Sequence, residues 1–215
     1  MAARVAHEIR NPLVSIGGFA RRIREKLDAA NPIRKYSEII GAEVDRLEKI
    51  LQEILAFSKE SSPSPVPTDL NLLIRDAADL FRDTLLAKGI KMSIRLYDGF
   101  PRLLLDPHQM KQVFINLFAN AEQAMENGGT LDVVSESPGS KGPIVVRIIN
   151  SGPGISPDVM ANIFNPFFTT KPAGTGLGLA IVHRIVTNHG GSIQVENRPE
   201  GGVVFILALP VSIAG

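Results

Sequence analysis

Apolar residues recur at steps of three and four over the first sixty positions, a spacing that predicts two amphipathic helices with charged opposite faces. The stripe positions are Val5, Ile9, Ile16, Phe19, Ile23 and Leu27, then Ile33, Tyr36, Ile40, Val44, Leu47, Leu51 and Ile54. The second stripe also fits an a/d heptad seam. Pro32 suits the first turn of the second helix, where its missing N–H costs no hydrogen bond. Two helices joined by so short a turn pack antiparallel, so the chain begins with a helical hairpin.

An isolated hairpin cannot bury two such stripes. We therefore expect two copies of the chain to associate as a homodimer through a four-helix bundle. The alternative is that the hairpin packs only on the C-terminal part of its own chain.

A serine- and proline-rich run separates the hairpin from the rest of the chain and marks the best domain boundary. The run, Ser61-Ser62-Pro63-Ser64-Pro65-Val66-Pro67, is typical of a short, stiff linker. We therefore divide the chain into a helical domain at 1–59, a linker at 60–68 and a C-terminal domain at 69–215.

Helical and extended patterns alternate after the linker. Helices are predicted at 69–88, 106–126 and 177–188, and a short one opens at Ser156-Pro157. Strands are predicted at 90–97, 102–105, 130–136, 143–150, 192–196 and 203–209. Because the strands cluster as hairpins between helices, the pattern favours the α+β class, with a two-layer α/β sandwich rather than a doubly wound sheet.

Composition narrows the partners and the compartment. The 215 residues carry a formal net charge of +1, so no global basic field favours nucleic acid or a membrane surface. There are no cysteines, which excludes disulfides and fits a reducing compartment. We expect a soluble, cytoplasmic chain that contacts neither nucleic acid nor membrane. Because a candidate reactive histidine stands almost at the first residue, we also expect a longer protein, whose N-terminal regions could anchor it in a membrane.

The first candidate for chemistry is His7, which Glu8 follows directly and Asn11 follows one helical turn later. Neutral imidazole is a nucleophile near neutral pH, and a carboxylate on its other N–H fixes the tautomer and increases its basicity. Pro12 removes a backbone hydrogen bond just below and allows a kink that moves the histidine. A solvated histidine in a charged helix start explains the motif equally well when it is taken alone.

Two asparagines on the predicted helix at 106–126 suggest a metal. Asn116 and Asn120 lie one turn apart, and amide oxygens suit a magnesium ion that takes its other ligands from water and phosphates. Two polar residues on an exposed helix face are the alternative. Each asparagine abuts apolar residues, which favours a half-buried rim.

Glycine-rich segments suggest the rest of a nucleotide pocket. A strand of β-formers ends at Asn150 and runs into Gly152 and Gly154, where backbone can approach a base, although a plain turn would look the same. The loop at 174–179 opens a helix, whose free N–H groups favour phosphates. Upstream, the aromatic segment at 164–171 suggests a lid or a docking surface, with Lys171 placed to meet phosphate, or a satellite core under a loop.

In this order and separation, the motifs resemble those of the catalytic core of bacterial two-component sensor histidine kinases over nearly the whole chain. The matching segments are 7–13 (H box), 116–121 (N box), 150–154 (G1 box), 164–168 (F box) and 174–179 (G2 box). The resemblance implies a dimerisation and histidine phosphotransfer domain followed by a gyrase-like ATP-binding domain. It implies autophosphorylation of His7 from Mg-ATP and phosphotransfer to an aspartate of a response regulator, and it leaves phosphatase activity toward that regulator open.

The same resemblance assigns roles to single residues. His7 would accept the phosphoryl group, Glu8 would activate it, and Asn11 would position water for dephosphorylation. Asn120 would hold Mg2+, with Asn116 in support, and the segment at 164–171 would belong to an ATP lid. The residues that would contact ATP are Asn116, Asn120, Asn150, Gly152, Gly154, Thr170, Lys171, Gly174, Thr175, Gly176, Leu177 and Gly178.

One position departs from the family pattern. The G1 box usually begins with aspartate, which accepts the exocyclic amine of adenine, whereas this chain has Asn150. An amide can still pair with adenine, or it can rotate and match guanine. We expect nucleotide binding to survive with weaker discrimination of adenine from guanine, which competition of GTP against a labelled ATP analogue tests. Weaker nucleotide binding altogether is the alternative.

Two other functions stay open at this point. A catalytically silent or phosphatase-biased dimeric regulator would keep the bundle and Asn11. A serine kinase or ATPase of the same sandwich fold would use ATP without modifying His7. The first sixty residues argue against the second of these, because such an enzyme has no need of a bundle histidine beside Glu8.

Overall fold

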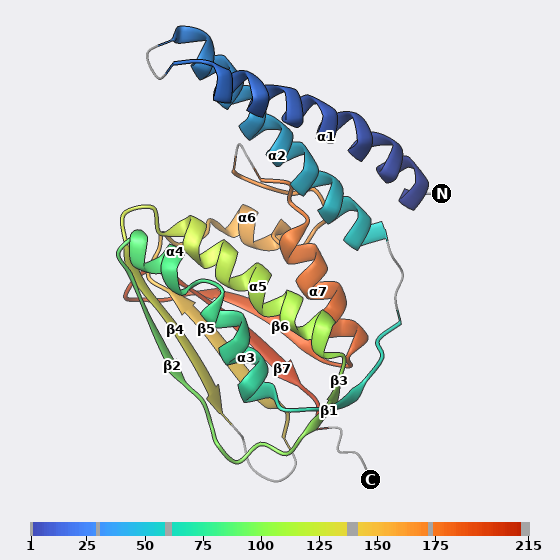
Figure 1. Ribbon diagram of the computed structural model, residues 1–215. Coiled ribbons are helices and arrows are strands. Elements are labelled where there is room, and N and C mark those ends of the chain that lie inside the picture. Colours follow the sequence, from blue (N-terminus) through green and yellow to red (C-terminus); the bar gives the residue numbers. More distant parts are fainter. Residues whose placement is uncertain (1, 29–30, 59–61, 137–141, 172–173, 212–215) are drawn as a thin grey trace. The chain divides into compact units, whose positions relative to one another are not determined.

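The structure is a computed structural model that describes residues 2–28, 31–58, 62–136, 142–171 and 174–211 (Figure 1). The chain divides into two compact units, Met1–Glu60 and Ser61–Gly215. Among the described residues, no helix combines the length and the apolar character needed to cross a bilayer.

The first unit is a hairpin of two long helices, α1 (Ala2–Lys26) and α2 (Pro32–Ser58). Among its described side chains, the buried apolar residues are Leu13, Ala20, Val44 and Leu51. The helices approach closely at Gly17, where an added Cβ would lie 3.1 Å from Val44 Cγ1. Pro12 lies inside α1, which continues through it. The predicted helical hairpin is therefore confirmed.

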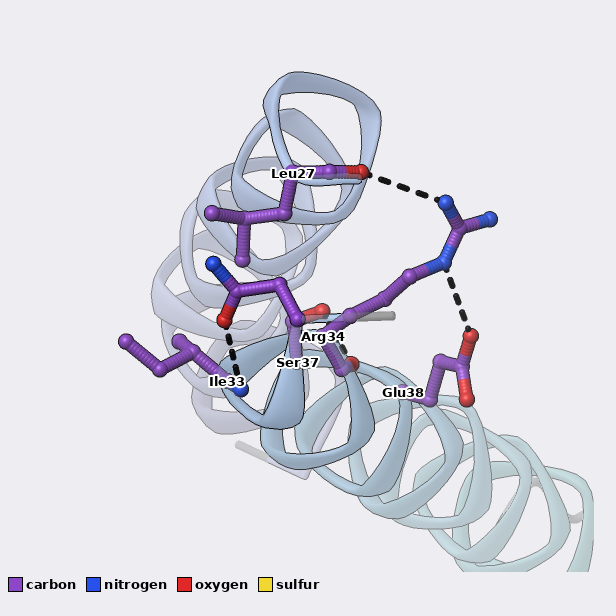
Figure 2. Close-up of polar contacts among 6 residues, drawn as sticks. Leu27, Ile33, Arg34, Ser37 and Glu38 are labelled. Carbon is purple, nitrogen blue, oxygen red and sulfur yellow. Dashed lines mark hydrogen bonds and ion pairs between the residues drawn. The ribbon is translucent and has the colours of Figure 1, made fainter. Parts of the chain in front are cut away.

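Hydrogen bonds around Arg34 close the turn between the two helices (Figure 2). Arg34 Nη1 donates to the Leu27 carbonyl at 3.2 Å, and its Nε donates to Glu38 Oε1 at 3.5 Å. Asn31 Oδ1 accepts the N–H of Ile33 at 3.0 Å. A guanidinium beside the carbonyls at the end of α1 is also favoured by the helix dipole. Side chains at the start of α2 thus bind the backbone at the end of α1 and in the first turn of α2.

Most of the stripe residues stay exposed in the single chain. Phe19 and Tyr36 are 63% and 65% exposed. The other exposed members are Ile9, Ile16, Ile23, Ile33, Ile40, Leu47 and Ile54. Burial of such side chains contributes about 25 cal/mol per Å² of apolar surface, so a contiguous exposed set of this size marks an interaction face.

The second unit is a two-layer α/β sandwich around a five-stranded sheet in the order β2-β4-β5-β7-β6. The strands are β2 (Ile90–Arg95), β4 (Gly129–Glu136), β5 (Ile144–Asn150), β6 (Ser192–Asn197) and β7 (Val203–Leu209). The pair β2–β4 is parallel, and the other three pairs are antiparallel.

Helices cover one face of this sheet (Figure 1): α3 (Leu70–Asp79), α5 (Pro107–Ala124) and α7 (Gly178–Asn188). The unit also contains the short helices α4 (Arg82–Ala87) and α6 (Pro157–Asn162), and a small sheet of β1 (Val66–Thr68) and β3 (Leu103–Leu105). The α+β class and the two-layer sandwich predicted from the sequence are confirmed.

Strict alternation places the core on the inner face of the sheet. Every second residue of β5 and β7 is buried, from Ile144 to Asn150 and from Val203 to Leu209. Fully buried residues of α5 pack over that face: Met110, Val113, Phe114, Leu117 and Phe118. Because Asn150 continues the buried set of β5, its side chain lies on the face that the helices cover.

The helix predicted at 69–88 is instead two helices, α3 and α4. Asp69 caps α3, since its side chain accepts the N–H of Leu72 at 3.0 Å. The break falls at Phe81, whose ring packs edge-on against Phe118 with centroids 5.9 Å apart and planes at 81°. This contact with α5 overrides the local helical periodicity.

The expected linker at 60–68 is shorter than the sequence indicates. Residues 66–68 form β1, which pairs antiparallel with β3, and Ser64 N–H donates to Asp106 Oδ2 at 3.0 Å. Pro67 is tolerated because β1 is an edge strand. A strand of three residues is too short to show a period, so no sequence pattern marks it. Residues 59–61 lie outside the described part.

Asp106 connects the segment just before β1 to the start of α5. Its Oδ1 accepts the N–H groups of His108 at 3.0 Å and Gln109 at 3.1 Å, and its own N–H donates to His189 Nε2 at 3.0 Å. Burial by itself raises the pKa of Asp106. The three backbone donors, from Ser64, Gln109 and His108, together with His189, outweigh it and hold that pKa below the ordinary value of 3.8.

We expect Asp106→Ala to lower the free energy of unfolding by about 1–2 kcal/mol at pH 7, because the helix loses its cap. Asp106→Asn keeps a capping oxygen but not the charge. Since the folded pKa is depressed, stabilisation by the carboxylate is complete above about pH 3.8 and is lost as the pH falls through the lower folded pKa. Urea titrations of the wild type and both variants at several pH values measure this. An Asn variant whose stability deficit stayed constant down to pH 2 would contradict the assignment.

Candidate functional site

Asn116 and Asn120 lie one turn apart on α5, and both are half-buried. Asn116 Nδ2 donates to the carbonyl of Gly178 at 3.1 Å, at the first residue of α7. Gln112 Nε2 donates to Asn116 Oδ1 at 2.9 Å and so fixes the amide. Asn116 therefore ties α5 to the end of the glycine loop, a contact between segments far apart in the sequence.

Lys171 is bound to the same helix. Its Nζ donates to Asn120 Oδ1 at 2.9 Å and to Gln123 Oε1 at 3.0 Å. Burial lowers the pKa of Lys171, and the charge of Glu122 opposes that effect. Amide oxygens that hold an ammonium ion also suit Mg2+ with water and phosphate as its remaining ligands, so the donor set fits the expected metal. Sequence reasoning missed Gln123, although its place three residues after Asn120 puts it on the same helix face.

Asn150 ends β5 and is only 2% exposed. Its Oδ1 accepts the N–H of Gly152 at 3.1 Å, which closes a tight turn. A Cβ at position 152 would lie 2.9 Å from the Ala124 carbonyl oxygen, so this approach requires glycine. Beside it, Ser151 Oγ accepts the N–H of Thr130 at 2.8 Å.

The glycine loop crosses the aromatic segment at Gly176. Phe167 N–H donates to the Gly176 carbonyl at 3.0 Å, and both residues have positive φ, 66° at Phe167 and 69° at Gly176. An added Cβ at Gly176 would lie 2.4 Å from the Phe167 carbonyl carbon. Leu177 N–H donates to Thr175 Oγ1 at 3.3 Å just before α7 begins. The segments at 164–168 and 174–178 are therefore locked backbone to backbone.

The other expected contact residues lie nearer the surface. Thr170 and Gly174 are exposed, and Gly174 N–H donates to the Lys171 carbonyl at 3.0 Å. Gly154 is also exposed, and a Cβ there would lie 3.1 Å from Asn197 Oδ1.

His7, Glu8 and Asn11 lie on α1, in the first unit. The side chains of His7 and Glu8 are outside the described part, so their predicted roles stay predictions. Asn11 is exposed, and its carbonyl accepts the Ser15 hydroxyl at 3.2 Å.

Comparison with known protein families shows which family contains all of these segments in one chain. Residues 105–213 match the family model described as histidine kinase-, DNA gyrase B- and HSP90-like ATPase. Residues 1–63 match the His Kinase A (phospho-acceptor) domain. The chain belongs to the two-component histidine kinase family. The family resemblance drawn from the five motifs is thereby confirmed.

Curated relatives of this histidine kinase align along nearly its whole length. It is 38% identical to sensor histidine kinase ZraS of Escherichia coli (strain K12), over 99% of this chain and 45% of that protein. It is 36% identical to sporulation kinase A of Bacillus subtilis (strain 168), over 98% of this chain and 34% of that protein. The chain thus spans less than half the length of these relatives.

Solved structures of histidine kinases share the fold. Full-length ShkA in complex with AMPPNP matches with a TM-score of 0.83 and 28% identity, over 100% of this chain and 46% of that one. Histidine kinase ThkA in complex with response regulator protein TrrA matches with a TM-score of 0.72 and 41% identity, over 99% of this chain and 61% of that one.

Proposed function

We propose that this histidine kinase core transfers the γ-phosphoryl group of ATP to His7 and then to an aspartate of a response regulator. The observation that carries the proposal is that one chain matches both a phospho-acceptor domain and an ATPase domain. The phospho-acceptor match includes His7, and the ATPase match includes Asn116, Asn120, Asn150 and the glycine loop. The complex of ThkA with a response regulator supports a partner of that class.

In the proposed reaction, a ring nitrogen of neutral His7 forms the new P–N bond while the bond from the γ-phosphorus to ADP breaks. Glu8 takes up the proton that the imidazolium must lose, and Asn11 positions water when the regulator is dephosphorylated. The groups that orient the nucleotide come from the second unit. Its contribution is mainly positioning and charge neutralisation, because phosphoryl transfer needs little covalent help.

Lys171 and Asn120 hold the phosphate end in this proposal. Asn120 would hold Mg2+, which would supply neutralisation of the phosphate oxygens. Lys171 Nζ would then exchange Asn120 Oδ1 for a phosphate oxygen, because two cations do not share one amide oxygen at contact distance. The N–H groups at the start of α7, with Gly178 held by Asn116, face the phosphates.

We also propose that the active form is a homodimer, placed in the cytoplasm where ATP and response regulators are present. The exposed stripe on α1 and α2, including Phe19 and Tyr36, supports it, because a second hairpin would bury those side chains. The phospho-acceptor match to residues 1–63 supports the same assembly.

Incubation of the chain with γ-labelled ATP and Mg2+ tests the kinase proposal. We expect protein-bound label that acid removes and alkali does not, which is the behaviour of phosphohistidine. Alkali-labile, acid-stable label would instead indicate a serine kinase. Nucleotide binding without any label would favour the phosphatase-biased regulator, for which the departure at Asn150 is the motivating observation.

We expect Gln123→Ala to tighten Mg-ADP binding by about threefold. Gln123 Oε1 accepts from Lys171 Nζ at 3.0 Å, and loss of this contact makes movement of the lysine to phosphate easier by about one weak hydrogen bond. Titration calorimetry measures the change, with Gln194→Ala on the exposed edge strand β6 as the matched control. Weaker binding in the Gln123 variant would show that the residue supports the nucleotide and not the lysine.

A further inference from the structure

Asn150 presents a hydrogen-bond donor, not an acceptor, to whatever occupies the corner at the end of β5. Its Oδ1 is already bonded to Gly152 N–H at 3.1 Å. A backbone N–H pairs only with the oxygen end of an amide, so rotating the amide by half a turn would set two donors against each other. Of the two orientations of the Asn150 amide that the sequence allowed, the backbone N–H of Gly152 therefore selects the one with Oδ1 toward the turn.

The Nδ2 of the same amide is free to meet a ligand. Within the described part of the chain, Nδ2 makes no hydrogen bond, and Asn71 Oδ1 is the one fully buried side-chain nitrogen or oxygen without a partner. Nδ2 therefore reaches solvent, although Asn150 as a whole is 2% exposed. An unused donor on an otherwise buried side chain is a strong selector, because a mismatched ligand leaves it unpaired.

The hydroxyl of the neighbouring Ser151 does not supply the corner with a free hydrogen-bond acceptor in place of the Asn150 donor. Ser151 Oγ accepts the N–H of Thr130 at 2.8 Å and donates to Met125 Sδ at 3.7 Å. The Ser151 hydroxyl is therefore engaged both as an acceptor, from β4, and as a donor, to the end of α5. Of these two neighbouring side chains, Asn150 is the one that keeps a donor, Nδ2, without a hydrogen-bond partner.

We propose that this corner binds 6-oxopurine nucleotides, carrying guanine or hypoxanthine, at least as tightly as adenine nucleotides. The inference rests on the proposed function, because it assumes that the base of the nucleotide lies here. A C6 carbonyl accepts from Nδ2, whereas Oδ1 is already occupied by Gly152 N–H. An adenine in the same orientation would bring its exocyclic amine against Nδ2, donor to donor.

Calorimetric titration of the whole chain with the Mg2+ complexes of ADP, GDP and IDP tests the proposal. Nucleoside diphosphates have no γ-phosphoryl group, so binding is measured without transfer. We expect GDP and IDP to bind with dissociation constants equal to or below that of ADP. Similar values for GDP and IDP would assign the effect to the C6 carbonyl, because IDP lacks the 2-amino group of guanine.

Asn150→Asp supplies a second readout, since it replaces the donor with an acceptor. We expect the ratio of GDP to ADP dissociation constants to rise about tenfold, which corresponds to one hydrogen bond gained or lost. Asn127→Asp makes the same chemical change in the exposed turn after α5 and should leave the ratio unchanged. The wild-type ratio decides the proposal even if the Asn150→Asp variant fails to fold.

The outcomes distinguish failure of the proposed base preference from failure of the proposed kinase function. Tighter binding of ADP than of GDP and IDP in the wild type, by more than the error of the titration, would overturn the inference and leave the kinase proposal standing. No binding of any of the three would overturn both. An unchanged base ratio in Asn150→Asp would place the base elsewhere and overturn the inference alone.

Discussion

His7→Ala will carry no acid-labile phosphate after incubation with γ-labelled ATP, while its affinity for Mg-ADP stays within about twofold of the wild type. The proposed chemistry needs an imidazole nitrogen as nucleophile, and His7 is the one histidine in the sequence of α1. Nucleotide affinity should persist because the proposed contacts belong to the second unit. Acid and alkali treatment of the labelled protein, beside calorimetry, measures both quantities.

His7→Gln is the control for damage to the helix, because glutamine is a good helix former of similar size. It should match the alanine variant in label and the wild type in helical content. Label that persisted in both variants would move the acceptor to another residue and favour a serine kinase of the same fold.

Gly176→Ala will weaken Mg-ADP binding at least tenfold. The added Cβ would lie 2.4 Å from the Phe167 carbonyl carbon and 2.6 Å from Phe168 N, both backbone atoms that cannot move away alone. The φ of 69° is also a strained conformation for alanine, at a cost of about 1–3 kcal/mol. The loop must therefore shift as a whole, and its N–H groups lose their alignment with the phosphates.

Gly178→Ala is the matched comparison, because it makes the same change two residues later in the same motif. A Cβ there meets only Asn116 Cγ at 4.0 Å, an ordinary contact. Its loss of affinity should be several-fold smaller. Equal losses in the two variants would show that the motif fails for a reason other than the backbone crossing at Phe167.

A mixture of the His7→Ala and Gly176→Ala proteins then addresses how a dimer would work. His7→Ala lacks the acceptor and Gly176→Ala binds nucleotide weakly, so the mixture is tested at an ATP concentration at which Gly176→Ala alone carries no label. Label on the Gly176→Ala chain in the mixture would mean transfer between protomers. Its absence, with mixed dimers demonstrated, would mean transfer within one chain.

Long, strictly patterned elements could be predicted from the sequence. One face of β5, β7, α1 and α2 is apolar. Its residues therefore repeat along the sequence with the period of a strand or a helix, which can be recognised without a structure. The break at Phe81 and the strand β1 could not be predicted in this way. Both depend on a partner distant in sequence, Phe118 in the first case and β3 in the second.

In the candidate site, too, local motifs predicted some residues, whereas contacts between distant segments could not be predicted. The motifs pointed to Asn116, Asn120 and Gly176 because the chemistry of phosphate and metal binding restricts residue type and spacing. The contact of Lys171 with Gln123 joins positions 48 residues apart and leaves no mark in either local pattern. The direction in which the Asn150 amide points is likewise a property of the folded turn, since Gly152 N–H sets it.

The position of β5 in the sheet has a consequence for how nucleotide preference can change over evolution. Asn150 is paired on one side with Leu131 of β4 and on the other with Val203 of β7. Its backbone is therefore held by two neighbours, independently of what its side chain carries. An exchange of one residue there can alter which base is accepted without resetting the register of any strand. Selectivity for the base can thus drift by single substitutions while the scaffold that presents it is inherited unchanged.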